Sequence, residues 1–446
     1  MTSRELALAV ARDVFGGAPG AKLRGAHESF DYRASRSGLD ARDRAFAAEL
    51  AYGAIRARRY LDWLLQPYVG ARRKDLPPAI AEILRLGAYQ LARMSVEPHA
   101  AVAESVGLAK RYGHRGTAGL VNAVLRRVAE RAPGDRLPKR EEFASDEDFL
   151  GTLHSFPSWI VALVRRVFGD VLLDESLLGM NAPPRAAVRV NLLRASREEV
   201  QALLGDAGVR TTPSPLVSEI LLVDEAPASA HLGDPELRWE QHAEIAAVPV
   251  DLLDPKAGES GVELCGGRGN KTLQIVARMQ GRGFLESYDD DERKVAALRA
   301  RLERFGAGGV AVHAGDARRL ARRDAGFVLL DAPCSALGIL GRQPEARWRK
   351  DPGDPARLSA LQAQMLDAAA NAVAQGGRLV YSVCSFAPEE TRELVARFLR
   401  EHHEFARGAV PQRYAPWLTP EGELRWTPGI QRRDGFFVVL LERRAA

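Results

Sequence analysis

The fold of this chain is decided by Gly261-Val262-Glu263-Leu264-Cys265-Gly266-Gly267-Arg268-Gly269-Asn270-Lys271-Thr272. This stretch predicts a short strand, a glycine-rich turn and the start of a helix, in that order. Glycines in such a turn let a cofactor approach the backbone, and a helix N-terminus favours polar or anionic groups. Alone the signal is weak, because nucleotide sites and S-adenosylmethionine sites share it. The spacing does not fit the phosphate-binding Gly-x-x-x-x-Gly-Lys-Thr loop.

Three acidic side chains follow the strands that are predicted around this turn. They are Asp289 after residues 283–288, Asp316 after residues 310–313, and Asp331 after residues 327–330. An acid at the tip of the second strand can accept the hydroxyl hydrogens of a ribose, and one at the tip of the third can accept from an adenine amino group. From about residue 245 onward strands alternate with helices, which predicts an α/β fold with a parallel sheet covered on both faces.

The chain has three cysteines, and two of them stand in similar settings. Cys334 lies in Leu330-Asp331-Ala332-Pro333-Cys334-Ser335, and Cys384 lies in Val380-Tyr381-Ser382-Val383-Cys384-Ser385. Each follows an apolar, strand-like run and precedes a serine. Buried cysteines commonly act as small apolar side chains. The alternative is that neighbouring strand ends deliver two thiols to one site. Position alone leaves both interpretations open.

The first ~130 residues are predicted to be entirely helical. Apolar residues recur at helical spacing within 80–91, 102–109 and 120–128, and prolines at 77, 78 and 98 suit helix starts. Residues 1–131 contain 22 Lys and Arg against 13 Asp and Glu, whereas the rest contains 41 against 45. A basic module favours a polyanionic partner, although a solvated basic surface explains the charge equally well. The basic residues outside the apolar stripes are Arg56, Arg58, Arg59, Arg72, Arg73, Lys74, Lys110, Arg111, Arg115, Arg126 and Arg127.

A polar stretch at residues 131–148 is predicted to be a linker. It leads into a helical piece around Phe156-Pro157-Ser158-Trp159 and then a small mixed α/β segment. That segment is predicted to contain a strand at 187–193, a helix at 197–204 and a strand at 216–223. The expected domains are therefore residues 1–135 (all α), 145–240 (small, mixed α/β) and 241–446 (α/β).

Bulk properties exclude several classes of protein. A hydrophobic fraction of 46% and a charged fraction of 27% are typical of a soluble globular protein. Residues 1–15 lack the apolar core of a signal peptide, and no stretch approaches the ~20 apolar residues that span a membrane. With three cysteines, a cytoplasmic location is expected, with no membrane partner. A metal site is not expected, because there is no Cys-x-x-Cys pair and His402-His403 are adjacent.

At these motifs the chain resembles the RNA cytosine-5 methyltransferase family, and within it the bacterial 16S ribosomal RNA methyltransferase B group. The resemblance implies a Rossmann-like S-adenosylmethionine-dependent methyltransferase domain, preceded by a small α/β subdomain and an N-terminal all-α NusB-like helical bundle. For the bundle, the resemblance lies in Leu84-Arg85-Leu86-Gly87-Ala88-Tyr89-Gln90-Leu91 and Gly119-Leu120-Val121-Asn122-Ala123-Val124-Leu125-Arg126-Arg127. For the subdomain, it lies in Val188-Arg189-Val190-Asn191-Leu192-Leu193. In the methyltransferase domain, it lies in Asp331 to Ser335 (motif IV), Tyr381 to Ser385 (motif VI) and Asp434-Gly435-Phe436-Phe437 (the closing strand).

This resemblance implies an enzyme that methylates C5 of cytosine in 16S ribosomal RNA or a small-subunit assembly intermediate. It implies that Cys384 is the nucleophile that adds to C6, that Cys334 assists its release, and that Asp331 hydrogen-bonds or protonates the ring near N3. The cofactor-binding residues that it implies are Cys265, Gly266, Gly267, Arg268, Gly269, Asn270, Lys271, Asp289, Asp316 and Asp331.

The chain departs from the family pattern around the cofactor turn. Motif I usually reads Cys-Ala-Ala-Pro-Gly-Gly-Lys-Thr, whereas here Arg268 replaces its proline and Asn270 replaces its second glycine. Glu263 stands where Asp is usual, and Glu240-Gln241-His242 stands where Val-Gln-Asp is usual. These changes leave a second hypothesis open, an RNA-binding or assembly protein with a degenerate, non-catalytic methyltransferase domain. Titration with S-adenosylmethionine separates the two hypotheses.

Overall fold

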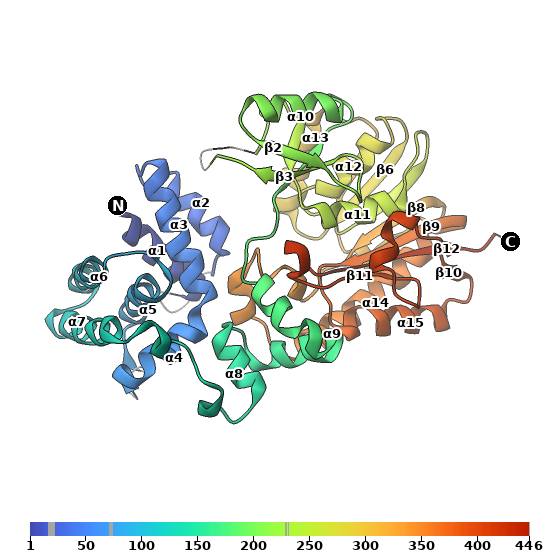
Figure 1. The fold of residues 1–446 in the computed structure, drawn as a ribbon. Coiled ribbons are helices and arrows are strands. Elements are labelled where there is room, and N and C mark those ends of the chain that lie inside the picture. Colours follow the sequence, from blue (N-terminus) through green and yellow to red (C-terminus); the bar gives the residue numbers. More distant parts are fainter. Residues whose placement is uncertain (17–22, 71–74, 228–229, 231, 446) are drawn as a thin grey trace. The chain divides into compact units, whose positions relative to one another are not determined.

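The computed structural model describes residues 1–16, 23–70, 75–227, 230 and 232–445 (Figure 1). They form two compact units: Met1–Asn181 with Leu340–Lys350, and Ala182–Ile339 with Asp351–Ala446. The basic residues Arg72, Arg73 and Lys74 lie outside the described residues. Within the described ranges, no helix is long and apolar enough to cross a membrane.

The first unit begins with the helical module that the sequence predicts. Its helices are α1 (Ser3–Phe15), α2 (Ala26–Ala34), α3 (Ala41–Arg56), α4 (Arg58–Val69), α5 (Pro78–Arg93), α6 (Pro98–Tyr112) and α7 (Arg115–Glu130). Helices α5 and α6 begin at proline, which has no backbone N–H to leave unsatisfied there. Gly87 allows α7 to pack closely, because a Cβ at this position would lie 2.4 Å from Leu125 Cδ1. The all-α prediction is confirmed.

After α7 the predicted linker contains the short helices η2 (Pro133–Arg136) and η3 (Arg140–Glu142). The helices α8 (Asp146–Leu153) and α9 (Ser158–Gly179) follow it. The Arg59 side chain of α4 fastens this segment, donating to Thr152 Oγ1 (3.1 Å), the Phe156 carbonyl (2.9 Å) and Ser158 Oγ (2.7 Å). Helices α8 and α9 therefore belong to the first unit, and the three-domain division by sequence remains a proposal.

A short segment from much later in the chain also belongs to the first unit. Residues 340–350 contain η6 (Pro344–Trp348), in which the Arg347 side chain is fully buried. Its guanidinium lies over the Phe156 ring, 3.8 Å from the centroid. It donates to Asn181 Oδ1 (2.7 Å) and to the carbonyls of Ser155 (3.1 Å), Met180 (3.3 Å) and Leu340 (3.3 Å). The chain thus enters the first unit shortly after Cys334 and then returns to the second.

We expect Arg347→Ala to lower the free energy of unfolding by about 2–4 kcal/mol, because it leaves a cavity and removes the donor that four oxygens share, three of them buried carbonyls. Urea unfolding followed by circular dichroism measures this loss. Gln343→Ala, at an exposed position of the same segment, serves as the control. Equal stability of the two variants would show that the segment is not held by Arg347.

The second unit contains a small antiparallel sheet of strands β1 (Ala187–Val190), β2 (Arg210–Pro213), β3 (Ile220–Glu225) and β4 (Trp239–Gln241), in the order β2-β3-β1-β4. Helix α10 (Arg197–Asp206) packs on it through Val200 and Leu204. The sequence predicted β1, α10 and most of β3. It did not predict β2, which is largely exposed and has no apolar alternation, or β4, which has only three residues.

The larger sheet has the strand order β10-β12-β9-β8-β5-β6-β7, and β11 pairs with β12. The five strands from β9 to β7 in this order are mutually parallel, as predicted. At the other end of the sheet, β12 pairs antiparallel with β9, and β10 pairs antiparallel with β12. The strands are β5 (Ser260–Leu264), β6 (Phe284–Asp289), β7 (Val310–Ala314), β8 (Ala325–Asp331), β9 (Val373–Val383), β10 (Phe405–Arg407), β11 (Leu424–Trp426) and β12 (Phe436–Arg443).

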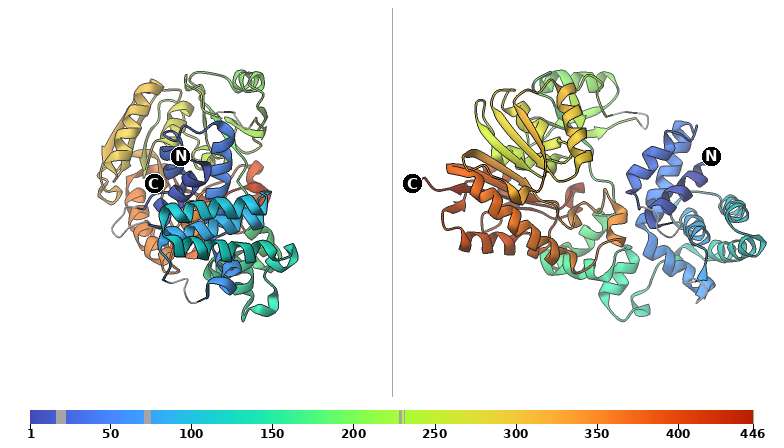
Figure 2. Two further views of the ribbon diagram at one scale, coloured as in Figure 1. Left: turned by 90° about the vertical axis from the view of Figure 1, so that its left-hand side faces the viewer. Right: turned by 180° about the vertical axis from the view of Figure 1, so that it is seen from behind.

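Helices cover both faces of this sheet, which confirms the α/β prediction (Figure 2). One face carries α11 (Glu244–Leu253), α12 (Asn270–Arg278) and α13 (Glu292–Phe305), and the other carries α14 (Asp354–Ala372) and α15 (Arg392–Glu401). The connections include η4 (Ala317–Arg319), η5 (Leu337–Ile339), η7 (Pro388–Glu390), η8 (Gln412–Trp417) and η9 (Ile430–Arg432).

The strand order reverses between β5 and β8. From β5 the chain builds outward through β6 to β7, and it then returns to build β8 and β9 on the other side of β5. In open α/β sheets, ligands bind outside the carboxyl ends of the strands at such a reversal. The topology therefore predicts a ligand site at the residues that follow β5 and β8.

Candidate active site

The turn between β5 and α12 needs glycine at three places. Gly267 and Gly269 have φ of 60° and 87°, a region that side chains with a Cβ rarely adopt. A Cβ on Gly266 would lie 2.2 Å from Ser287 Oγ. Because these residues carry no side chains, the backbone at the start of α12 is left open to a ligand.

The buried carboxylate of Glu263 supports this turn from the protein interior. Glu263 is 1% exposed, and its Oε2 accepts hydrogen bonds from Thr272 Oγ1 (2.5 Å) and Ser287 Oγ (2.7 Å). Burial raises the pKa of Glu263, although the two hydroxyl donors act in the opposite direction. The carboxylate thereby links β5, β6 and the first turn of α12.

The three acids at the strand tips have different surroundings. Asp289 reaches the turn, because its Oδ2 accepts from the Gly267 N–H (2.9 Å) and its Oδ1 from the Asp291 N–H (3.0 Å). Asp316 instead accepts from the guanidinium of Arg318, whose hydrogen bonds lower the pKa of Asp316 to about 2. The structure brings Asp289 to the turn, whereas the Asp316 carboxylate contacts Arg318.

Asp331, at the end of β8, is held by two side chains from neighbouring elements. Lys271 Nζ of α12 lies 2.5 Å from Asp331 Oδ2, and Ser382 Oγ of β9 donates to Oδ1 at 2.7 Å.

Burial raises the pKa of Cys265 to about 12, and the charges of Asp331 and Asp289 add to this effect. Cys265 is therefore a protonated thiol at neutral pH, surrounded by the residues of the turn.

The structure brings Cys334 and Cys384 together. Their Sγ atoms are 3.4 Å apart, because β8 and β9 are adjacent parallel strands with Asp331 opposite Ser382. The hydrogen bond with Cys384 raises the pKa of Cys334 well above its usual range, and partial burial and the charge of Glu390 add to it. Cys334 thus keeps its proton at neutral pH, and the two thiols are within hydrogen-bonding distance of each other.

Glu390, in η7, holds the two cysteine segments in register. It is fully buried; its Oε1 accepts from the Ser335 N–H (2.8 Å), and its Oε2 accepts from Ser385 Oγ (2.5 Å) and from Ser335 Oγ. The two serine hydroxyls lie 3.0 Å apart. Sequence reasoning missed this residue. The serine after each cysteine was the available signal that a shared acceptor lies behind the pair.

Mild oxidation should join Cys334 to Cys384 and leave Cys265 free, because only the first two sulfurs lie in contact. Glu390→Ala should slow this cross-link, since the two serines lose their common acceptor. Mass spectrometry of tryptic peptides during oxidation with diamide measures both effects. Glu393→Ala, at an exposed position of α15, is the control. A cross-link that involves Cys265, or equal rates in both variants, contradicts this geometry.

The residues around the turn fit S-adenosylmethionine. Gly266, Gly267 and Gly269 leave the backbone uncovered, the start of α12 offers unpaired N–H groups, and the Asp289 carboxylate has lone pairs for ribose hydroxyls. The Arg268 and Asn270 side chains are exposed at the outer end of the turn. They therefore do not fill the space above the glycine backbone.

Three families match successive parts of the chain. The NusB family matches residues 1–130, the ferredoxin-like domain of RsmF/B-type methyltransferases matches residues 156–229, and the 16S rRNA methyltransferase RsmB/F family matches residues 250–442. Together with the turn and the strand-end acids, these matches define a NusB domain joined to an S-adenosylmethionine-dependent, Rossmann-like methyltransferase.

Two relatives match this chain over nearly its full length, and a third matches a smaller part of it. The probable ribosomal RNA small subunit methyltransferase B of Synechocystis sp. is 30% identical, covering 99% of this chain and all of that protein. The crystal structure of PH0851 matches with a TM-score of 0.82 at 25% identity and covers 99% of each chain. NSun6 from Pyrococcus horikoshii, solved with SFG, has a TM-score of 0.58 at 19% identity over 66% of this chain and all of that one. The chain belongs to the ribosomal RNA small subunit methyltransferase B family.

Proposed function

We propose that this ribosomal RNA methyltransferase acts on C5 of a cytosine in small-subunit (16S) ribosomal RNA and uses Cys384 as a covalent nucleophile. The observation that carries the proposal is the pair of sulfurs 3.4 Å apart, at the same sheet edge as the Lys271–Asp331 pair. The printed names of the full-length relatives support the small-subunit substrate.

Covalent catalysis suits this reaction because C5 of cytosine is a weak nucleophile. Addition of the Cys384 thiolate to C6 forms an Sγ–C6 bond and pushes the C5–C6 electron pair toward C5. S-adenosylmethionine, when bound, would supply the electrophilic methyl group: the C5 electron pair would form the C5–methyl bond, and the pair of the broken methyl–sulfur bond would stay on the cofactor sulfur. A base then removes the C5 proton, the electron pair of that bond restores the C5–C6 double bond, and the Sγ–C6 pair returns to sulfur.

Cys334 has a separate role in this cycle. Its raised pKa keeps the thiol protonated, so it is a hydrogen-bond donor rather than a nucleophile at neutral pH. From 3.4 Å it can stabilise negative charge on the Cys384 sulfur, both before addition and when the sulfur leaves C6. Loss of this donor should impair release more than attack.

The cysteines act at C6 of the ring, whereas Asp331 and Lys271 act near N3. Attack at C6 increases electron density toward N3, and the 2.5 Å Lys271–Asp331 pair can supply a hydrogen bond or a proton there. Ser382 orients the same carboxylate. The residues proposed to hold the cofactor are the turn from Cys265 to Lys271, together with Asp289, Asp316 and Asp331.

The first unit provides a surface for the surrounding RNA. Its exposed basic side chains can bind phosphates without reading sequence, and the target base must leave its stack to reach the cysteines. A cytoplasmic location follows from this proposed substrate.

Cys384→Ala should abolish methylation, because no thiol is left to activate C5. Cys334→Ala should instead accumulate a covalent enzyme–RNA adduct, because attack proceeds but release is slowed. Methyl transfer to 16S RNA, read by bisulfite mapping, and denaturing gels of enzyme–RNA mixtures measure the two effects. Glu393→Ala, at an exposed position of α15 outside the site, is the control and should keep both activity and normal release.

Equal activity of the Cys334→Ala and Cys384→Ala variants would overturn the proposed roles. Absence of S-adenosylmethionine binding at millimolar cofactor, measured by calorimetry, would instead favour a non-catalytic RNA-binding or assembly protein.

A further inference from the structure

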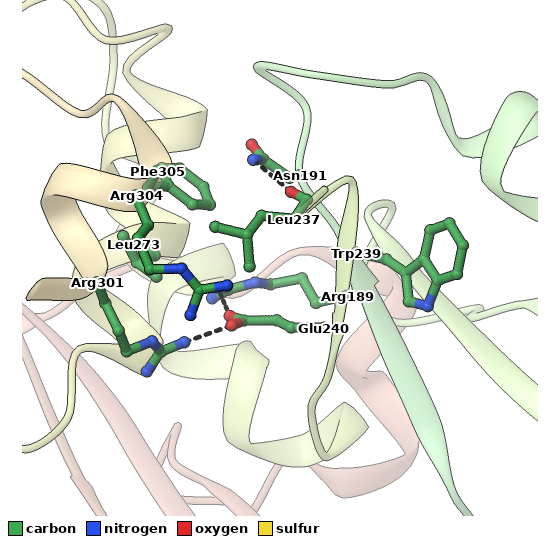
Figure 3. Close-up of a pocket in the computed structure, with 9 residues that line it drawn as sticks. All are labelled: Arg189, Asn191, Leu237, Trp239, Glu240, Leu273, Arg301, Arg304 and Phe305. Atoms are coloured by element: carbon green, nitrogen blue, oxygen red, sulfur yellow. Dashed lines mark hydrogen bonds and ion pairs between the residues drawn. The ribbon is translucent and has the colours of Figure 1, made fainter. Parts of the chain in front are cut away.

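A cavity of about 30 Å³ lies in the second unit between the small sheet and α13. Figure 3 shows the Glu240 carboxylate between the guanidinium groups of Arg189 and Arg301, with an ion pair to each. Arg189 comes from β1, Glu240 from β4 and Arg301 from α13. Three elements that are distant in sequence therefore meet at one charged cluster.

The charged cluster is stable only when all three side chains are present. Arg189 is 3% exposed, and a buried guanidinium is costly unless it is paired and hydrogen-bonded. Glu240 supplies the pairing charge for Arg189 and for the more exposed Arg301. Removal of the Glu240 charge would leave Arg189 buried without a counter-ion.

Both guanidinium groups also reach the cofactor turn. Arg301 Nη1 donates to the Arg268 carbonyl (2.6 Å) and to Asn270 Oδ1 (2.7 Å), and Arg189 Nη1 donates to the Asn270 carbonyl. These contacts hold Arg268 and Asn270, which we call the outer end of the turn, whereas Glu263 holds Thr272 in the first turn of α12. The side chains of Arg268 and Asn270 are exposed and do not anchor this end by packing.

The turn itself has little intrinsic preference for one conformation. Gly267 and Gly269 can adopt many backbone angles, so ordering them costs conformational entropy when a ligand requires one arrangement. A clamp that fixes both ends of the turn before the ligand arrives removes that cost from binding.

We propose that Arg189, Glu240 and Arg301 are positioning residues for S-adenosylmethionine, which clamp the outer end of the cofactor turn to the small antiparallel sheet. Cofactor affinity then depends on a subdomain that contributes no strand to the methyltransferase sheet. The chemistry at the cysteines lies at the ends of β8 and β9, so the clamp acts on cofactor binding and not on the rate of the bound complex. The inference does not depend on which base or atom is methylated.

Calorimetric titration of the full chain with S-adenosylmethionine tests the clamp. Arg301→Met should raise the Kd on the order of tenfold, the loss expected for about 1.4 kcal/mol of hydrogen bonding. The single-turnover rate at saturating cofactor should stay within about twofold, because the clamp does not touch the reacting atoms. Arg304→Met is the matched control, since Arg304 is an exposed arginine of the same helix that lines the same cavity.

A second readout uses the protein without cofactor. Amide hydrogen exchange in peptides that cover residues 264–272 should be faster in Arg301→Met than in the parent and unchanged in Arg304→Met. Glu240→Gln should give the same change with nearly the same side-chain shape. The Glu240→Gln, Arg301→Met double variant should lose less affinity than the two single losses added together, because both act through one cluster.

Unchanged Kd and unchanged exchange in Arg301→Met would overturn the inference. If Arg301→Met lowers the unfolding midpoint, Arg301→Lys decides the matter: it keeps a charge for Glu240 but lacks the planar fork that serves both acceptors. Parent-like affinity in Arg301→Lys then also counts against the clamp. If Arg301→Met abolished methylation but kept normal S-adenosylmethionine affinity, the clamp would also be contradicted. This holds whatever the outcome of the tests of the cysteine mechanism.

Discussion

The parallel pairing of β8 with β9 is the constraint on which the rest of the site depends. Since Asp331 lies opposite Ser382, the residues that follow these strands emerge at one edge of the sheet. This register places Cys334 Sγ 3.4 Å from Cys384 Sγ and lets Ser382 hold Asp331. A shift of one residue would turn alternate side chains to the opposite face and separate these groups.

Each functional loop rests on a buried carboxylate that accepts hydroxyl hydrogen bonds. Glu263 holds Thr272 and Ser287 beneath the cofactor turn, and Glu390 holds Ser335 and Ser385 beneath the cysteines. A buried acceptor costs free energy unless it is satisfied, so each carboxylate favours the loop arrangement that supplies its donors. The loops are thereby fixed from the interior, and their outer surfaces stay open to ligands.

The sequence predicted those parts of the fold that depend on local pattern. Helices that begin at Pro78 and Pro98, the strands before Asp289 and Asp331, and the placement of both cysteines at strand ends followed from periodicity, turn residues and the motif resemblance. These features are set by neighbouring residues in the chain, and the family matches then confirmed the fold class.

Other features depend on contacts between distant residues and could not be predicted. Arg347 is held by residues more than 160 positions earlier, and Glu390 meets Ser335 across 55 positions. The clamp joins Arg189 to Asn270 across 81 positions. Glu240 and Asn270 depart from the family pattern in two separate segments of the sequence, and the structure places both in one network with Arg301.

The most direct test of the account is to trap the covalent intermediate with RNA that contains 5-fluorocytosine. Fluorine at C5 cannot leave as a proton does, so the enzyme–RNA bond persists after methyl transfer and its position can be mapped by mass spectrometry of the digested complex. The account predicts that the RNA is attached to the peptide that contains Cys384. Attachment at Cys334, or methylation of cytosine C5 without any adduct in the fluorinated RNA, would contradict it.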